Sequence, residues 1–153
     1  MQKKYRKNVA IFVLNTDGQI LVCERNDANG AWQLPQGGID PEESPEQAMK
    51  RELLEEIGTN NVTLIDSLTN PIRYDWPEHL YSRGYHGQEQ YYFLVRIEDV
   101  TSISLDSHEK PEFQQIRWVG AQEFLKIEAG FKKSAYEQAL TQFIKKHRTL
   151  ISV

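Results

Sequence analysis

The sequence predicts an α/β protein in which a β-sheet is covered by helices on both faces. Apolar, β-branched runs that suit strands recur along the 153 residues, and two longer segments show the apolar spacing of amphipathic helices. Such a mixture buries its apolar surface by packing helices against a sheet. The length predicts a single domain, residues 1–153, and no repeat or linker divides it.

The first elements are a hairpin and a short extended stretch. Residues 9–14 and 19–24 read as strands, and the Asp17-Gly18 pair between them is typical of a hairpin turn. Residues 26–30 are polar and predict a loop, after which 31–36 extend toward Gly37 and Gly38. Cys23 is the single cysteine, so no internal disulfide can form and we expect it to be buried.

The best-marked helix begins after Ser44, a good N-cap. Pro45 suits the first helical position, Gln47 completes a capping box, and Gly58 predicts the end. The apolar residues of this helix are expected to form one face that packs on the sheet: Met49, Leu53, Leu54 and Ile57.

The rest of the chain is expected to add strands, loops and two helices. Strands are predicted at 62–66, 90–97 and 115–119, with shorter ones at 72–74 and 102–105. A short helix is predicted at 122–126 and an amphipathic C-terminal helix at about 134–147. Residues 69–87 predict a long loop, and loops of this length are often functional.

Charge and hydropathy exclude some classes of protein. The net charge of −4 does not favour a footprint on duplex nucleic acid. The cations Lys3, Lys4, Arg6 and Lys7 form either a solubilising tail or a grip for phosphates. The apolar run at 9–14 is too short for a signal peptide or a membrane span, so we expect a cytoplasmic protein without membrane contact.

Three glutamates crowd one face of the predicted helix near its C-terminal end. Glu52, Glu55 and Glu56 lie at i, i+3 and i+4, where like charges repel and the helix dipole disfavours anions. A solvated face with splayed side chains is one interpretation. The opposite face is apolar and docked, which favours a site for a hard divalent cation such as Mg²⁺, Mn²⁺ or Ca²⁺. Gly37 and Gly38 would let the backbone approach a ligand closely.

The spacing G37-x5-E43-x7-R51-E52-L53-x-E55-E56-x-G58 resembles the Nudix box residue by residue. Thr59 stands where that family usually has an aliphatic residue. The resemblance implies an α/β/α sandwich with a mixed sheet, a catalytic loop-helix-loop at about 37–59, and hydrolysis of a nucleotide substrate with divalent metal. It also implies two sets of box residues. Its metal ligands would be the Gly37 carbonyl, Glu52, Glu55 and Glu56, and its positioning residues Glu43 and Arg51.

The flanking segments resemble one Nudix subgroup, the bacterial RNA pyrophosphohydrolases and the similar dinucleoside polyphosphate hydrolases. They read Tyr5-Arg6-x-Asn8-Val9, Trp32-Gln33-Leu34-Pro35-Gln36-Gly37-Gly38, Pro111-Glu112-Phe113, Arg117-Trp118-Val119 and Phe131-Lys132-x3-Tyr136. Lys7 stands where one known pattern has proline. The resemblance implies Mg²⁺-dependent cleavage of a phosphoanhydride at an RNA 5′ end, as in mRNA decay, or in diadenosine tetraphosphate.

Other Nudix substrates and a non-catalytic nucleotide sensor are the alternatives, and a sensor would usually lack box acids. Oligomeric state and a stimulating partner are not predicted.

The same comparison assigns the remaining site residues. Cations and an amide would hold the phosphates, and one aromatic ring would stack on a base: Arg6, Arg25, Gln36, Lys132 and Phe131. Tyr136 is either a second stacking ring or part of the core, and its helical spacing favours the core. Glu112 is a metal ligand, the general base or a solvated loop acid, and Glu55 or Glu56 competes with it as base. The predicted catalytic set is Glu52, Glu55, Glu56 and Glu112.

Overall fold

The computed structural model describes residues 2–153 and contains a sheet with helices on either side. The strands are β1 (Tyr5–Leu14), β2 (Ile20–Arg25), β3 (Trp32–Gln33), β4 (Gln36–Gly38), β5 (Val62–Ser67), β6 (Ile72–Asp75), β7 (Gly87–Ile97) and β8 (Phe113–Val119). The helices are α1 (Pro45–Ile57), α2 (Ala121–Leu125) and α3 (Lys133–Lys146), with short 3₁₀ turns η1 (Glu78–Leu80), η2 (Val100–Ser102) and η3 (Gly130–Lys132). None of the helices among residues 2–153 has the length and apolar character that crossing a membrane requires.

The sheet is mixed, as the sequence predicts. β1 and β7 run parallel along the whole of β1, and the other strand pairs are antiparallel. The central order is β3-β2-β1-β7-β5, with β4 beside β1, β6 beside β7 and β8 beside β2.

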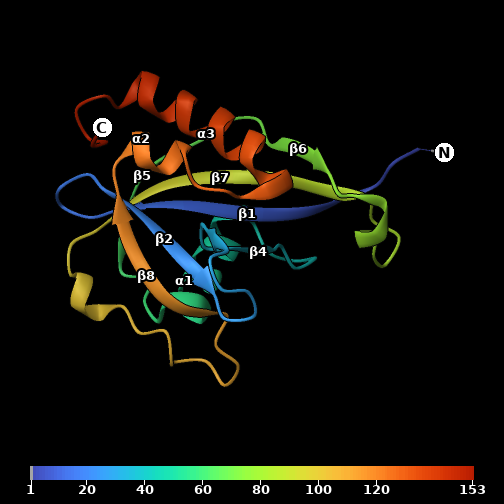
Figure 1. Ribbon diagram of the computed structural model, residues 1–153, viewed down its shortest axis with the longest axis horizontal. Coiled ribbons are helices and arrows are strands. Elements are labelled where there is room, and N and C mark those ends of the chain that lie inside the picture. The colour runs from blue at the N-terminus through green and yellow to red at the C-terminus, as the bar shows by residue number, and fades with distance from the viewer. Residues whose placement is uncertain (1) are drawn as a thin grey trace.

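The first two strands diverge after their hairpin. β1 faces β2 only where Leu14 lies opposite Ile20, and its other end pairs with β4 from Asn8–Gly38 to Ala10–Gln36. β2 pairs with β8 instead, and the two strands slant away from β1 in Figure 1. One group of strands is β1 with β4, and the other is β2 with β8. The divergence of these two groups leaves space for a cavity between them.

Two separate cores show that both faces of the sheet are covered. α2 and α3 pack on one face and α1 on the other (Figure 1). Alternate residues of β1 serve each core, with Phe12 on the side of α3 and Ile11 on the side of α1. Cys23 is fully buried in the second core, as predicted.

Two local predictions are wrong. Leu54 is 50% exposed, because the buried face of α1 extends over Glu52 and Glu56 and leaves Leu54 on its far side. Residues 102–105 form no strand. Asp99 caps the turn η2 by accepting from the Thr101 N–H, and the Ser104 N–H then donates to the carbonyl of Ile57 at the end of α1.

Candidate active site

The capping box fixes where α1 begins and so where its acids lie. Ser44 Oγ accepts from the Gln47 N–H at 3.1 Å, and Gln47 Oε1 accepts from the Ser44 N–H at 2.9 Å. Gly58 ends the helix in the left-handed conformation, with φ of 76°. No basic residue lies in the last turn to offset the helix dipole, so the acids there depend on other groups for stabilisation.

Arg51 clamps the glycine loop to the helix. Its guanidinium donates to both carboxylate oxygens of Glu43, at 2.6 and 2.8 Å, and to the carbonyl of Gly38 at 2.8 Å. It also donates to Glu52 at 2.8 Å. The hydrogen bonds from Arg51 lower the pKa of Glu43 to about 2, so this acid stays charged and fixed. The geometry suits the positioning roles predicted for Glu43 and Arg51.

Glu52 and Glu56 are buried carboxyl groups. Burial raises the pKa of Glu52 to about 7, against the opposing effect of Arg51. Burial also raises the pKa of Glu56 well above its usual range, and the charges of Glu112 and Glu52 add to this effect. Glu56 Oε1 accepts from the Gln36 N–H at 2.8 Å, whereas its Oε2 is buried without a hydrogen-bond partner. This buried oxygen keeps the capacity to bind a cation or a water molecule.

Two side chains of the site lie directly against the glycines of the loop. A Cβ added to Gly37 would lie 2.0 Å from Glu52 Cδ, and one added to Gly38 would lie 2.2 Å from Arg6 Nη2. Any larger residue would push the acid or the arginine away from the loop backbone.

The donor set fits a hard divalent cation. Its members are carboxylate oxygens, one of them buried and unpaired, beside a glycine backbone that leaves room for a ligand. Within residues 2–153 no three His, Cys, Asp or Glu side chains converge as ligands in their present rotamers. Glu52 and Glu55 instead turn toward Arg51, at 2.8 and 3.4 Å.

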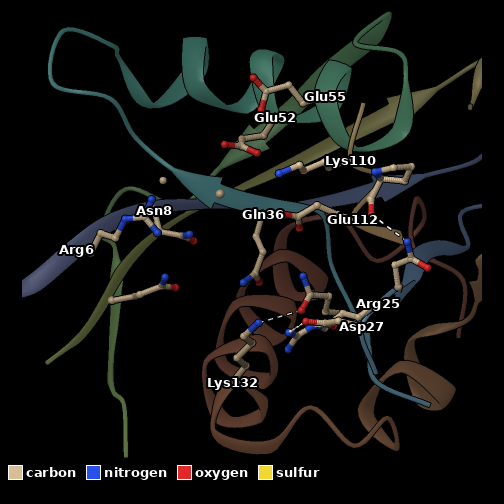
Figure 2. A pocket seen from close by; sticks show the side chains of 16 residues that line it. Arg6, Asn8, Arg25, Asp27, Gln36, Glu52, Glu55, Lys110, Glu112 and Lys132 are labelled. Atoms are coloured by element: carbon tan, nitrogen blue, oxygen red, sulfur yellow. Dashed lines mark hydrogen bonds and ion pairs between the residues drawn. The ribbon is translucent and has the colours of Figure 1, made fainter. Parts of the chain in front are cut away.

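A cavity of about 680 Å³ separates the acids from a group of cations (Figure 2). Glu52 and Glu55 project into it from α1, and Arg25 and Lys132 lie on the opposite side. Arg25 is held by two hydrogen bonds to Asp27, at 2.9 and 2.7 Å. Lys132 donates to Gln33 Oε1 at 2.9 Å, and burial lowers its pKa to about 8.

Most of the predicted site residues meet at this cavity. Those that line it are Arg6, Arg25, Gln36, Gly37, Glu52, Glu55, Glu112 and Lys132. Glu56 lies just behind, where it is bonded to the Gln36 N–H. Phe131 is not among the lining residues; it is 40% exposed and packs on Tyr74 with ring centroids 5.8 Å apart. Tyr136 belongs to the core, the interpretation that its spacing favoured.

Several lining residues were not predicted, among them Asn8, Gln33, Gln88 and Lys110. Asn8 has the same strand phase as Arg6, and Gln88 lies opposite Arg6 in the parallel register of β1 and β7. Because Arg6 was predicted to bind the substrate, its two-residue spacing from Asn8 on one strand could have predicted Asn8 as a site residue. No sequence pattern marks Lys110, which a loop carries to the cavity beside Glu112.

Comparisons with known proteins identify the family and the fold. The NUDIX domain pattern matches residues 4–139. The RNA pyrophosphohydrolase of Helicobacter pylori (strain G27) is 40% identical over 149 residues, which cover 94% of this chain and 96% of that protein. The RNA pyrophosphohydrolase of Sulfurovum sp. (strain NBC37-1) is 41% identical over 150 residues, with the same coverage. The solved Escherichia coli dihydroneopterin triphosphate pyrophosphohydrolase superposes with a TM-score of 0.74 at 21% identity, over 94% of this chain and 99% of that one.

Proposed function

This chain belongs to the NUDIX family, and from that premise we propose that it is a metal-dependent pyrophosphohydrolase. It removes pyrophosphate from the 5′-triphosphate end of RNA, hydrolyses dinucleoside polyphosphates such as diadenosine tetraphosphate, or does both. One observation carries the proposal: a single cavity has the carboxylates of Glu52 and Glu55 on one wall and the cations Arg25 and Lys132 on the other. A phosphate chain with bound metal needs such a pair of walls. The RNA pyrophosphohydrolases cited above match nearly the whole chain.

The residues that would hold the metal are the Gly37 carbonyl, Glu52, Glu55, Glu56 and Glu112. Oxygen ligands of this kind suit Mg²⁺, with Mn²⁺ or another divalent cation as a substitute. A bound divalent cation would lower the pKa of water and neutralise charge on the leaving phosphate. Arg51 and Glu43 contribute by fixing the direction in which Glu52 faces.

We assign the proton transfer to Glu112 in preference to Glu56. Glu56 is buried and already accepts from the Gln36 N–H. Glu112 is exposed on the cavity wall, where it can reach both water and solvent. Its backbone carbonyl accepts from the Asn26 N–H at 2.8 Å, which fixes the position of the loop. A general base must be within reach of its proton and able to pass it on.

The opposite wall would bind the phosphates. Arg25 is pre-oriented by Asp27, and an anion beside Lys132 would raise its lowered pKa and so keep its ammonium group charged. Arg6 approaches from β1 over Gly38. Phe131, the neighbour of Lys132 in the turn η3, would offer its exposed ring to a base.

Only the 5′ end of an RNA has to enter, so the net charge of −4 is compatible with this substrate and no duplex footprint is required. Such an activity would place the enzyme in the cytoplasm and in mRNA decay. All five charged positions of the box are present: Glu43, Arg51, Glu52, Glu55 and Glu56. A non-catalytic sensor would not need the complete set.

The test incubates purified protein and Mg²⁺ with a 5′-triphosphorylated RNA and, separately, with diadenosine tetraphosphate. We expect at least one of them to be hydrolysed, and Glu56→Gln to lose most of the activity. Glu42→Gln, an exposed acid of the loop before α1, is the matched control and should retain it. Hydrolysis of neither substrate by the wild type would contradict the proposal.

A further inference from the structure

The side chain of Gln36 is held by a tyrosine from the other end of the chain. Tyr136, on α3, donates its hydroxyl proton to Gln36 Oε1 at 2.6 Å. The same hydroxyl oxygen accepts from the Leu34 N–H at 3.4 Å, so its proton is directed to Gln36. Tyr136 is 3% exposed, and burial raises the pKa of its phenol well above the usual range, which keeps it a donor.

This bond determines which end of the amide faces the cavity. With Oε1 occupied by Tyr136, Nε2 is the free end of a side chain that lines the cavity. No hydrogen bond joins Nε2 to any side chain or backbone group within residues 2–153. An amide nitrogen can only donate, so it favours the oxygens of an anion.

The same arrangement recurs at two other amides of the cavity. Tyr74 donates to Gln88 Oε1 at 2.6 Å, which leaves the nitrogen of Gln88 free. Tyr92 donates to Gln90, and Gln90 Nε2 donates to Asn8 Oδ1 at 2.8 Å, which leaves the nitrogen of Asn8 free. In Gln36, Gln88 and Asn8, the amide oxygen therefore accepts a hydrogen bond from a side chain of the protein, and the amide nitrogen is left for a ligand in the cavity. The recurrence argues against an incidental contact at Gln36.

We propose that Tyr136 is a positioning residue, which holds Gln36 with its amide N–H groups directed at the phosphate chain of the substrate. The inference rests on the proposed function for its substrate. It adds that Gln36 contributes to phosphate binding only in the orientation that Tyr136 imposes. Without the phenol hydroxyl the amide can rotate, and its oxygen would then repel a phosphate oxygen.

A double-mutant cycle tests this dependence by steady-state hydrolysis of 5′-triphosphorylated RNA. Tyr136→Phe keeps the ring and should raise KM roughly tenfold with a smaller change in kcat, the effect of losing one hydrogen bond to an anion. Gln36→Ala should raise KM by a similar or larger factor. In the Gln36→Ala background, Tyr136→Phe should have no further effect on KM. An equal loss in both backgrounds would overturn the proposal, because Tyr136 would then act independently of Gln36.

A second measurement does not depend on turnover. The side-chain N–H₂ signals of Gln36 are assigned in the ¹H–¹⁵N spectrum by their loss in Gln36→Ala, and inorganic pyrophosphate is titrated without metal. The signals should shift in the wild type and in Tyr91→Phe, whose hydroxyl bonds Glu89 on the other face of β7. They should be broadened and insensitive in Tyr136→Phe.

An equal response in Tyr136→Phe would overturn the inference even if RNA is hydrolysed. A wild-type enzyme that binds pyrophosphate through Gln36 but hydrolyses neither substrate would instead remove the proposed function alone.

Discussion

Replacement of Glu52 by glutamine should stabilise the metal-free protein at alkaline pH while it abolishes catalysis. The side chain of Glu52 is 11% exposed, and burial raises its pKa from 4.5 to about 7. The folded state therefore keeps a proton that the unfolded chain releases between these two pH values. Stability contributed by the protonated form is complete below the unfolded pKa and falls as pH rises through the folded pKa.

The size of the effect follows from the shift. A change from 4.5 to about 7 corresponds to roughly 3 kcal/mol at about 1.4 kcal/mol for each pH unit. Glutamine carries no charge to desolvate, and the attraction of Arg51 for the Glu52 carboxylate is already included in the shift to about 7. The net gain of Glu52→Gln should therefore be about 3 kcal/mol near pH 8, and it should disappear near pH 4, where Glu52 is itself neutral.

Urea denaturation in the presence of a chelator, at several values between about pH 4 and 8, measures this difference. Glu42→Gln is the exposed control and should track the wild type throughout. Added Mg²⁺ should reverse the order, because the wild type would bind the metal more tightly than the variant and ligand binding stabilises the folded state. A variant that is less stable than the wild type near pH 8 without metal would refute the reasoning.

The remaining predictions concern the cavity wall and the helix. Arg25→Ala and Lys132→Ala should each raise KM about tenfold or more and change kcat less, as steady-state kinetics would show; the reverse split would contradict their phosphate roles. Lys110→Met should lower kcat/KM several-fold and weaken its dependence on salt, whereas Lys110→Arg should retain both; equal salt curves would argue against a charge contact. Leu53→Ala should cost about 2–5 kcal/mol in urea denaturation and Leu54→Ala under about 1, and equal losses would contradict the packing of α1.

Local signals in the sequence predicted the elements well. Ser44 and Gln47 make both bonds of the capping box, so the start of α1 is as predicted. The apolar and β-branched runs at 9–14 and 90–97 predicted strands, and β1 and β7 are both longer than expected because the pairing between them extends over their polar ends. Those polar ends, at Arg6 and Gln88, are the part that reaches the cavity.

Predictions failed where a tertiary contact decided the outcome. Leu54 is apolar like Leu53 and Ile57, but the buried face of α1 is turned toward Glu52 and Glu56, which leaves Leu54 exposed. The segment at 102–105 has strand-like residues, yet it is used to close the end of α1 through Ser104. Neither outcome can be read from spacing within one element.

The candidate site was predictable only as a set of residues. The acids of α1 could be grouped by helical spacing, but the bond between Gln36 and Tyr136 joins positions 100 residues apart. Lys110 reaches the cavity because Asn26 donates a hydrogen bond to the carbonyl of Pro111, the next residue of the loop. No sequence motif predicts this contact. The chemical roles of these residues, and of Phe131, stay predictions.

The most direct measurement of the central claim is the product formed from a 5′-triphosphorylated RNA by the purified protein with Mg²⁺. We predict a 5′-monophosphorylated RNA together with released pyrophosphate, and a loss of at least about a hundredfold in rate for Glu56→Gln. The assay is repeated with diadenosine tetraphosphate, where cleavage of the phosphate chain is the expected result. If the wild type leaves both substrates intact, or if Glu56→Gln hydrolyses them as fast as the wild type, the acids of α1 are not the catalytic centre.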